Sequence, residues 1–372
     1  MKVLILSCNT GEGHNSAARA IYEEMKQRKV PCKMMNALSF ANHKTAKIIT
    51  DSFNKIVTKT PRVFGLMYKT GDLVSNSLLK SPVYLANILY AKKLYNYIIS
   101  NNFDIIISSH LFPMEALTFL KFKYNLKAKC YGILTDYTCI PFLEETNMDA
   151  YFIPHEILKK ELIKHKIPKE KIVPLGIPVM NKFIGKEDKL VARKELKLPI
   201  ENKLIMLMTG GIGCGNVVFM LKSLLANLNN EEKIVVLVGK NKDLIKNIKD
   251  SFPKNKRIII VPFTKKVNIY MDACDILLTK PGGLSTTEAA VKGVPFIHTL
   301  PIPGCETKNA LFYEKCGMSL KANNIKELVI KTQELLRNEK LRRKIITNQT
   351  KHINKNASYD ICNYIIKSNI KN

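Results

Sequence analysis

The sequence predicts an α/β fold with two doubly wound parallel sheets, one in each half of the chain. Three observations lead to this prediction. Strand-like and helix-like segments alternate in both halves, the strand-like segments are nearly unbroken apolar runs, and a glycine-rich loop follows the first strand of each half. Unbroken apolar strands are typical of parallel sheets whose two faces are both covered by helices.

The expected elements follow from these runs in chain order. In the first half we expect strands at residues 3–7, 32–37, 104–108, 128–134 and 150–153, and helices at about 14–29 and 113–124. In the second half we expect strands at 204–208, 234–238, 258–261, 276–279 and 295–298, with helices between them and a last helix at about 358–370. Residues 40–101 break the alternation and predict several successive helices inserted into the first sheet domain.

A chain of 372 residues is long enough for two domains that each bury a core. The stretch 174–178 is bounded by prolines and contains a glycine, so it is the expected linker. We therefore expect an N-terminal domain over residues 1–175, with its insertion at about 40–101. A C-terminal domain should span 176–355, and a final helix 356–372.

Composition excludes several classes of protein. Hydrophobic residues make up 46% of the chain, which excludes a disordered one. No stretch is long and apolar enough to predict a membrane span, and the first seven residues predict a strand and not a signal peptide. The nine cysteines are scattered without a C-x-x-C pair, which indicates reduced thiols in a cytoplasm. Neither a disulfide framework nor a metal site is expected.

The net charge of +28 predicts a polyanionic partner, either nucleic acid or an anionic membrane face. Residues 26–101 hold 13 Lys and Arg against only Asp51 and Asp72. In the second half the lysines are spread over helices, where a general lysine bias of the composition explains them equally well.

The most informative stretch runs from Lys280 to Glu288, directly after a buried strand. Gly282 and Gly283 allow a sharp turn and the close approach of a ligand. The helix that opens at Ser285 then offers free N–H groups and a positive dipole end to an anion. A carboxylate at that mouth repels phosphate but accepts hydrogen bonds from ribose hydroxyls, so the loop predicts a nucleoside diphosphate site. An ordinary strand-to-helix turn is the alternative.

Glycine loops also follow the first strand of each half, at residues 7–14 and 208–215. A dinucleotide-binding fingerprint needs, in addition, an acidic residue about 20 residues further on, at the end of the next strand. That acid is absent after residues 32–36 and after 234–238, so NAD and FAD are not expected. No G-x-x-x-x-G-K-[ST] motif is present, which also argues against a P-loop ATPase.

His14 is the first candidate for catalysis, because a helix N-terminus lowers the pKa of histidine and favours the neutral base. A histidine that only caps or packs is an equal alternative. Asp136 ends an apolar strand, where it could orient an acceptor or a base, or be a plain turn residue. Glu306, Thr307 and Asn309 form a polar cluster that suits sugar hydroxyls, or else an N-capped helix. We expect structural or solvated roles for the other histidines.

These motifs together carry a resemblance to a known family. They are Thr10-Gly-Glu-Gly-His14, Thr135-Asp-Tyr137, Gly176-Ile-Pro178, Gly210-Gly-Ile-Gly-Cys-Gly215, Thr279-Lys-Pro-Gly-Gly-Leu-Ser285 with Glu288, and Pro301-Ile-Pro-Gly304 with Glu306 and Asn309. The chain resembles the glycolipid-forming glycosyltransferases, which include bacterial processive diacylglycerol glucosyltransferases and plastid monogalactosyldiacylglycerol synthases. The lipid II-forming N-acetylglucosaminyltransferase is a more distant relative. The resemblance covers nearly the whole chain.

The resemblance implies a GT-B architecture, with two Rossmann-like domains facing across a cleft. The C-terminal domain would bind a UDP-sugar, and the N-terminal domain would dock on an anionic membrane and take diacylglycerol. The final helix would return to the first domain. The implied reaction is an inverting transfer of a hexose, glucose or galactose, with no metal or other cofactor, at the cytoplasmic face of the cell membrane.

The resemblance also implies roles for individual residues. His14 would be the base, with Asp136 as the alternative, and Glu288 would hold the ribose. The UDP-sugar would be bound by Gly11, Gly13, Gly211, Gly213, Gly215, Phe263, Gly282, Gly283, Ser285, Thr286, Glu288, Glu306 and Asn309. Among these, the loop from Gly211 to Gly215 and the helix start at Ser285 and Thr286 would hold the diphosphate, and Phe263 would contact the uracil. Many relatives have Gln where this chain has Cys305, and the choice between glucose and galactose stays open.

Two rival functions remain at this stage: the same fold acting on a polyprenyl-linked or soluble acceptor, and a basic nucleic-acid-binding protein. The second rival predicts aromatic side chains for base stacking on a basic face. The aromatic residues between 53 and 97 lie among Leu, Ile and Met, which suits lipid. Apolar runs within residues 60–99 are flanked by Arg62, Lys69, Lys80, Lys92 and Lys93. This pattern is typical of a helix in a membrane interface, although packing on the first sheet is the alternative.

Overall fold

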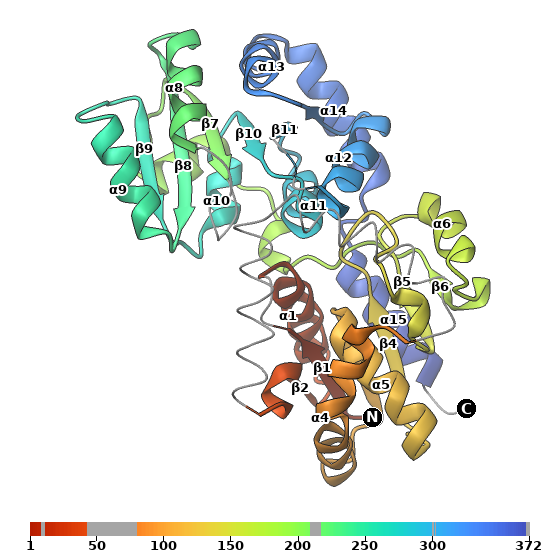
Figure 1. The fold of residues 1–372 in the computed structure, drawn as a ribbon. Coiled ribbons are helices and arrows are strands. Elements are labelled where there is room, and N and C mark those ends of the chain that lie inside the picture. The colour runs from red at the N-terminus through yellow and green to blue at the C-terminus, as the bar shows by residue number, and fades with distance from the viewer. Residues whose placement is uncertain (9–11, 43–79, 209–216, 300, 302, 370–372) are drawn as a thin grey trace. The chain divides into compact units, whose positions relative to one another are not determined.

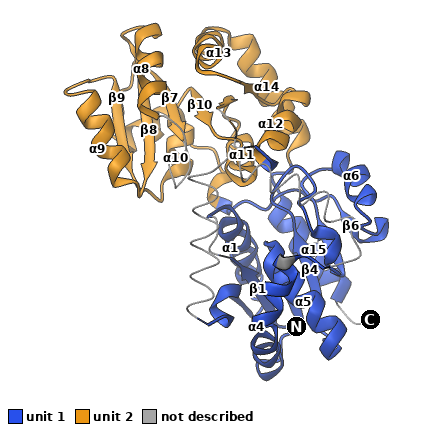
Figure 2. Ribbon diagram, viewed as in Figure 1, with its two compact units in different colours: residues 1–181, 302–305, 354–372 blue, residues 182–301, 306–353 orange. Residues whose placement is uncertain are grey.

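The computed structural model describes residues 1–8, 12–42, 80–208, 217–299, 301 and 303–369 (Figure 1). The chain forms two compact units (Figure 2): unit 1 comprises residues 1–181, 302–305 and 354–372, and unit 2 comprises 182–301 and 306–353. Each unit contains one six-stranded parallel sheet with helices around it, so the expected α/β class is confirmed.

The sheet of unit 1 has the order β2-β1-β3-β4-β5-β6. Its strands are β1 (Val3–Ser7), β2 (Cys32–Asn36), β3 (Ile105–Ser108), β4 (Lys129–Ile133), β5 (Ala150–Phe152) and β6 (Ile172–Val173). Its α-helices are α1 (Glu12–Gln27), α4 (Pro82–Ser100), α5 (Leu111–Tyr124), α6 (Lys159–Lys164) and α15 (Ala357–Asn369). Short 3-10 helices are η1 (Ala37–Phe40), η2 (Leu143–Glu145), η3 (Glu156–Leu158) and η4 (Lys169–Lys171).

The sheet of unit 2 has the order β12-β11-β10-β7-β8-β9. Its strands are β7 (Lys203–Met208), β8 (Glu232–Gly239), β9 (Ile258–Pro262), β10 (Ile276–Thr279), β11 (Phe296–His298) and β12 (Leu320–Lys321). The helices of this part of the chain are η5 (Asn181–Phe183), α7 (Lys189–Glu195), α8 (Val217–Asn227), α9 (Lys242–Ser251), α10 (Val267–Ala273), α11 (Gly283–Val291), α12 (Cys305–Lys315), α13 (Ile325–Arg337) and α14 (Glu339–His352).

The structure differs from the expectations at several element boundaries; α1 and α11, for example, begin two residues earlier than expected, at Glu12 and Gly283. Strands β6 and β12 were not expected, and each has only two residues at a sheet edge. Helix α5 begins at Leu111, two residues before the expected start, because the Nδ1 atom of His110 accepts a hydrogen bond from the Phe112 N–H at 3.1 Å and caps the helix. Of the expected insertion, residues 43–79 lie outside the described residues, and the later part forms α4.

The core of unit 1 includes side chains from α15. Ile361, Cys362 and Ile365 of this helix are buried together with Val3 and Ile5 of β1. Gly176 packs closely against the start of this helix, because a Cβ at this position would lie 3.0 Å from the Ala357 Cβ. Its φ of +98° also favours glycine. Directly after α1, the Arg28 guanidinium donates to the Asn363 side chain at 2.5 Å and stacks on the ring of Tyr359.

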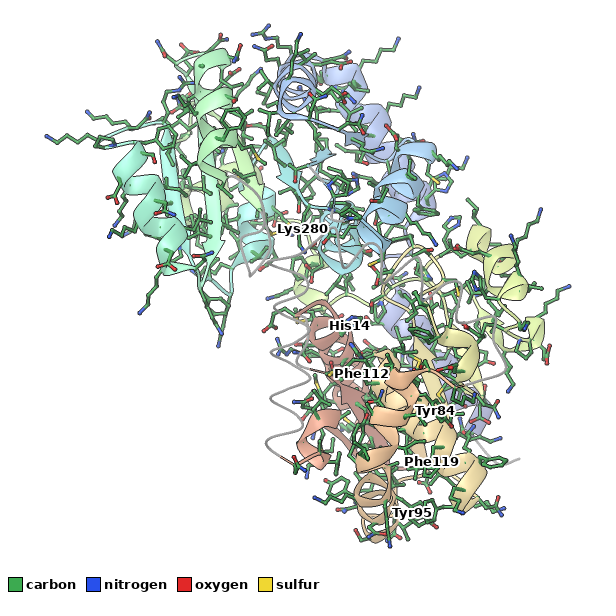
Figure 3. All side chains as sticks on the ribbon, viewed as in Figure 1. His14, Tyr84, Tyr95, Phe112, Phe119 and Lys280 are labelled. Atoms are coloured by element: carbon green, nitrogen blue, oxygen red, sulfur yellow. The ribbon has the colours of Figure 1, made fainter. Side chains whose placement is uncertain are left out.

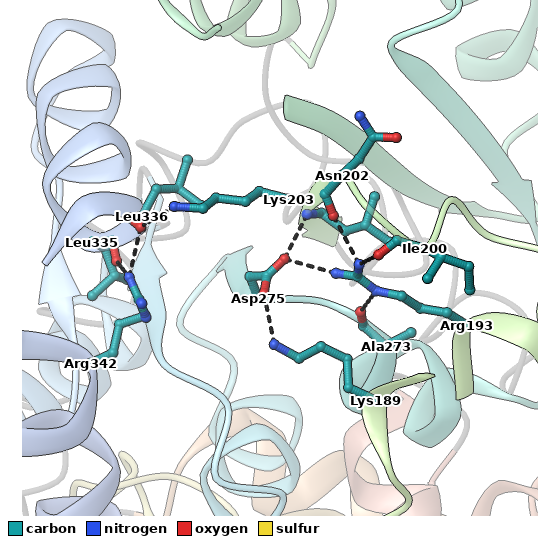
Figure 4. Close-up of polar contacts among 11 residues, drawn as sticks. Lys189, Arg193, Ile200, Asn202, Lys203, Ala273, Asp275, Leu335, Leu336 and Arg342 are labelled. Atoms are coloured by element: carbon teal, nitrogen blue, oxygen red, sulfur yellow. Dashed lines mark hydrogen bonds and ion pairs between the residues drawn. The ribbon is translucent and has the colours of Figure 1, made fainter. Parts of the chain in front are cut away.

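A charged network fixes the start of the central strands of unit 2 (Figure 4). The Asp275 carboxylate, directly before β10, accepts a hydrogen bond from the Leu204 N–H of β7 at 2.8 Å. The same carboxylate pairs with Arg193 at 2.9 Å and Lys189 at 2.7 Å. Arg193 is buried and also donates to three backbone carbonyls, those of Ala273, Ile200 and Asn202. The network therefore ties α7, β7 and β10 together.

We predict that Asp275→Ala lowers the free energy of unfolding by about 2–4 kcal/mol, because it leaves a buried guanidinium without its counter-charge and removes the acceptor of a strand N–H. Urea denaturation measures the change. Arg343→Ala is the matched control: its partner is Glu339 at 2.5 Å, but both side chains are mostly exposed, so its effect should stay below about 1 kcal/mol. Equal effects of the two substitutions would contradict this reading of the network.

Candidate active site

The loop between β10 and α11 forms the first part of the site, and Figure 3 marks Lys280 at its start. Gly282 is the N-cap of α11, and an added Cβ there would lie 3.2 Å from the Ser285 Oγ atom, so glycine keeps the helix mouth open. Ser285 is half-buried. Thr286 is fully buried, and its hydroxyl donates to the Gly282 carbonyl at 2.6 Å. The Ser285 hydroxyl also donates to the Gly282 carbonyl, at 3.4 Å, but only Ser285 is partly exposed at the surface of this first turn.

The loop lies at the topological switch point of the sheet, since β7 and β10 are neighbours although two strands separate them along the chain. Met208 and Thr279, the last residues of these strands, are register partners. Ligands of open α/β sheets bind outside the carboxyl ends of the strands at such a point. The glycine loop after Met208, with Gly211, Gly213 and Gly215, lies outside the described residues.

Helix α12 is tied to this loop by two contacts. The Lys280 Nζ atom pairs with the Glu306 Oε1 atom at 2.7 Å, and the Asn309 side chain donates to the Pro281 carbonyl at 3.1 Å. Asn309 is fully buried and Glu306 nearly so. The structure thus brings together the two most specific motif blocks of the sequence, and it gives Asn309 a tethering contact within the protein.

Glu288 is buried, with 8% of its surface exposed, and its side-chain carboxyl group forms no hydrogen bond among the described residues. Burial raises the pKa of its carboxyl group to about 8, and the charge of Lys182 counteracts this only in part. The carboxyl group is therefore largely protonated at neutral pH in the unliganded protein. A buried polar group without a partner is unfavourable, which is typical of a group that receives its hydrogen bonds from a ligand.

Phe263 directly follows β9, and its ring is 58% exposed with the Lys240 ammonium 5.0 Å from the ring centre. Strand β9 is at the edge of the sheet, so Phe263 is at its carboxyl end but not at the switch point. An exposed aromatic face can stack on a flat base, and the lysine above it favours an anionic ligand.

The second group of candidates surrounds His14 in unit 1 (Figure 3). His14 is the third residue of α1, and its Nδ1 atom lies 2.8 Å from the Ser109 carbonyl oxygen and 3.0 Å from the Thr135 Oγ1 atom. A carbonyl oxygen only accepts hydrogen bonds, so Nδ1 carries the proton. The Nε2 atom of neutral His14 is then the basic one.

The electrostatic surroundings keep His14 neutral. Burial lowers the pKa of its imidazole, while the charge of Asp136 and the hydrogen bond to the Ser109 carbonyl oppose this shift. The charge of Asp136 thus acts on His14, so the two residues that the sequence indicated as candidates for the base are close to each other. Gly13 is on the first turn of α1, whereas Gly11 lies outside the described residues.

Three residues of this group were not predicted. The Nδ1 atom of His14 contacts Ser109 and Thr135. The ring of His14 contacts the ring of His110, with centroids 4.5 Å apart. Ser109 and His110 follow β3, and β3 pairs with β1. The sequence signal was a polar triplet, Ser-Ser-His, at the end of a buried strand, which is where an open α/β sheet binds its ligand.

No group of three or more His, Cys, Asp or Glu side chains within the described ranges is arranged to hold a metal ion.

Comparisons with known proteins support the recognition made from the motifs. The model of the monogalactosyldiacylglycerol (MGDG) synthase family matches residues 14–179, and that of the glycosyl transferases group 1 matches residues 192–352. The processive diacylglycerol beta-glucosyltransferase of Bacillus pumilus is 27% identical over 343 residues, which are 91% of this chain and 87% of that protein. That of Staphylococcus saprophyticus is 26% identical over 326 residues, 87% of this chain and 81% of that protein. The resemblance to the glycolipid-forming glycosyltransferases is therefore confirmed.

Solved structures confirm the GT-B fold. Acinetobacter baumannii MurG has a TM-score of 0.63 at 14% identity, covering 98% of this chain and 99% of that chain. The UDP-GlcNAc 2-epimerase of Neisseria meningitidis, bound to UDP-GlcNAc, has a TM-score of 0.64 at 15% identity, covering 99% of this chain and 100% of that chain.

We predict that Glu288→Gln stabilises the unliganded protein, and increasingly so as the pH rises. The unfolded carboxyl has a pKa near 4.5 and the folded one about 8, so the folded protein binds the proton more tightly. Wild-type stability therefore falls between these two pH values, whereas glutamine does not ionise and escapes the loss. Melting temperatures measured across this pH range give the difference. The exposed Glu231→Gln is the control, and a Glu288→Gln difference that does not vary with pH would contradict the assignment.

Proposed function

We propose that this chain, a relative of the glycolipid-forming glycosyltransferases, transfers a hexose from a UDP-sugar to diacylglycerol with inversion at the anomeric carbon. Glucose is the favoured sugar, with galactose as the alternative. The observation that carries the proposal is the junction of the β10–α11 loop with α12, where the start of α11, a buried Glu288 and the Lys280–Glu306 pair come together. The names of the relatives support the lipid acceptor, because both are processive diacylglycerol glucosyltransferases.

Unit 2 would bind the donor. The free N–H groups at the start of α11 and the hydroxyl of Ser285 suit a diphosphate. We expect the glycine loop of residues 210–215 to bind the same diphosphate. The ribose hydroxyls would supply the hydrogen bonds that Glu288 lacks, and Phe263 would stack on the uracil. Glu306, held by Lys280, would face the hexose.

His14 would act as the general base through Nε2. It removes the proton from the acceptor hydroxyl while the oxygen attacks the anomeric carbon from the face opposite UDP. Negative charge then grows on the leaving diphosphate, and the helix N–H groups stabilise it without a divalent ion. Asp136 would stabilise the imidazolium that forms, since its charge acts on His14.

Unit 1 would dock on the membrane, at its cytoplasmic face and as a peripheral protein. Leu85 and Leu89 of α4 are 57% and 74% exposed, and Phe122 of the adjoining α5 is 89% exposed. Lys92 and Lys93 are exposed on the same helix as the leucines. Exposed apolar side chains beside basic ones suit an anionic lipid surface. None of the described helices is both long and apolar enough to span a bilayer.

Two lysines of the expected docking segment are not part of the argument for this surface. Lys69 lies outside the described residues. Lys80 donates to the Glu145 carbonyl at 3.3 Å and lies over the Tyr84 ring, so it has a structural contact. The docking proposal therefore rests on Lys92 and Lys93.

The direct test is to incubate the purified protein with UDP-glucose, UDP-galactose or UDP-GlcNAc and with diacylglycerol or a polyprenyl phosphate in mixed vesicles. Mass spectrometry resolves the lipid products, and NMR of the product gives the anomeric configuration. A β-linked hexosyl diacylglycerol, formed equally in excess EDTA, is expected. Product on the polyprenyl lipid alone, or an α-linkage, would overturn the proposal.

We predict that His14→Ala lowers turnover about 10²-fold or more, because the acceptor hydroxyl loses its general base. Its affinity for UDP should stay within a few-fold of wild type, since His14 is in unit 1 and the donor contacts are in unit 2. Single-turnover kinetics and calorimetry measure the two quantities. Near-normal turnover would transfer the role to Asp136.

We predict that the double variant Lys92→Glu, Lys93→Glu loses most of its binding to anionic vesicles, while UDP binding remains. Each lysine near an anionic surface contributes about 1 kcal/mol, and added salt screens the attraction. Vesicle sedimentation at low and high salt is the measurement. Lys326→Glu with Lys340→Glu, two exposed lysines of unit 2, gives the same charge change as a control. Equal losses in both double variants would refute a specific docking face.

A further inference from the structure

We propose that His110 is a positioning residue for His14, and that its ring holds the catalytic imidazole in place and shields it from water. The inference rests on the proposed function for its kinetic consequences, but its physical core concerns the two histidines alone. It adds a role to a histidine for which the sequence indicated only a structural one.

The sheet order brings the two residues together. Strands β1 and β3 are paired, and each is followed by a loop and a helix at the same edge of the sheet. His14 is on the first turn of α1, and His110 is the N-cap of α5. Their rings meet edge to face, with centroids 4.5 Å apart and an interplanar angle of 77°. The Ser109 hydroxyl also donates to the His14 carbonyl at 2.9 Å, so the two backbones are joined.

The hydrogen bonds of His110 determine its protonation. Its Nδ1 atom accepts from the Phe112 N–H at 3.1 Å, so the proton of the neutral ring is on Nε2. The ring is 7% exposed, and burial together with the neighbouring His14 holds its pKa well below the usual range. His110 therefore stays neutral at physiological pH. It is bound to α5 through its own cap, and its ring also contacts the Phe112 ring, with centroids 4.5 Å apart.

The groups that face His14 divide into two sets. The charge of Asp136 and the Ser109 carbonyl both favour the imidazolium, and the Thr135 hydroxyl lies at the same Nδ1 atom. Burial opposes them and prevails, so the pKa of His14 is lowered. The ring of His110 is a neutral neighbour that contributes to this burial. Without it, water would reach the imidazole, its pKa would rise, and the orientation of Nε2 would loosen.

Two substitutions separate the ring from the cap. His110→Asn keeps an N-cap acceptor for the Phe112 N–H but removes the ring. His110→Phe keeps a ring of similar size but removes the cap. His155→Asn is the matched control, because His155 caps η3 in the same way, with Nδ1 accepting from the Ile157 N–H at 3.2 Å.

The first measurement does not depend on activity. NMR titration of labelled histidine rings follows the pKa of His14 in the full chain. We expect a higher pKa of His14 in His110→Asn, and values near wild type in His110→Phe and His155→Asn. An unchanged pKa in His110→Asn overturns the inference, even if the chain turns out to use another substrate.

The second measurement is the pH profile of kcat/KM for the glycosyl transfer. We expect His110→Asn to lose about 10-fold or more in turnover and to move the acidic limb of the profile to higher pH, because the base is protonated sooner. His110→Phe should recover most of the activity. Wild-type behaviour of His110→Asn contradicts the inference. So does equal loss in both His110 variants with an unshifted acidic limb, since His110 would then act on the substrate itself.

Discussion

The pairing of β7 with β10 is the constraint on which unit 2 depends. Leu204 and Asp275 are 71 residues apart, and a carboxylate supplies one of the bonds that join the two strands at their start. From this junction the two strands stay in register up to their last residues, Met208 and Thr279. The position of the loop after β10, the proposed diphosphate site, thus depends on a charged network at the opposite end of these strands. A helix start offers backbone N–H groups to a ligand, and these groups cannot adjust by changing rotamer, so a site built on one needs a rigid scaffold.

Sequence patterns predicted the buried strands well because each is a continuous apolar run between loop residues. The run from Ile276 to Thr279 is an example, and its bounds agree with β10. Strands β6 and β12 were not predicted, because a strand of two residues is too short to show a hydrophobic periodicity. Their pairing depends on the neighbouring strands β5 and β11. The start of α5 was misplaced because a histidine side chain acts there as a cap, a role usually taken by Ser, Thr, Asp or Asn.

The sequence predicted the motifs of the candidate site, but it did not predict which of their side chains are buried and hydrogen-bonded within the protein. Thr286 looked like a phosphate contact, yet its hydroxyl is used by its own helix, as is common for threonine within a helix. Asn309 was assigned to the sugar, and the structure shows a buried side chain that holds the adjoining loop. The contact between His14 and His110 depends on the order of the strands, which no local pattern reveals. In contrast, the position of Glu288 one turn inside the helix followed directly from the spacing.

The place of α15 has a consequence for how the protein is made. Arg28 and Asn363, which bond to each other in unit 1, are 335 residues apart, and the whole of unit 2 is encoded between them. During translation the ribosome therefore releases β1 and α1 long before the helix that covers them exists. Before α15 is synthesised, the side chains of Val3 and Ile5 lack part of their apolar cover. The sequence of unit 2 is complete before that helix is made. Synthesis thus favours unit 2, the half proposed to bind the sugar donor, as the first finished domain, and leaves unit 1, the half proposed to meet the lipid, as the last to close.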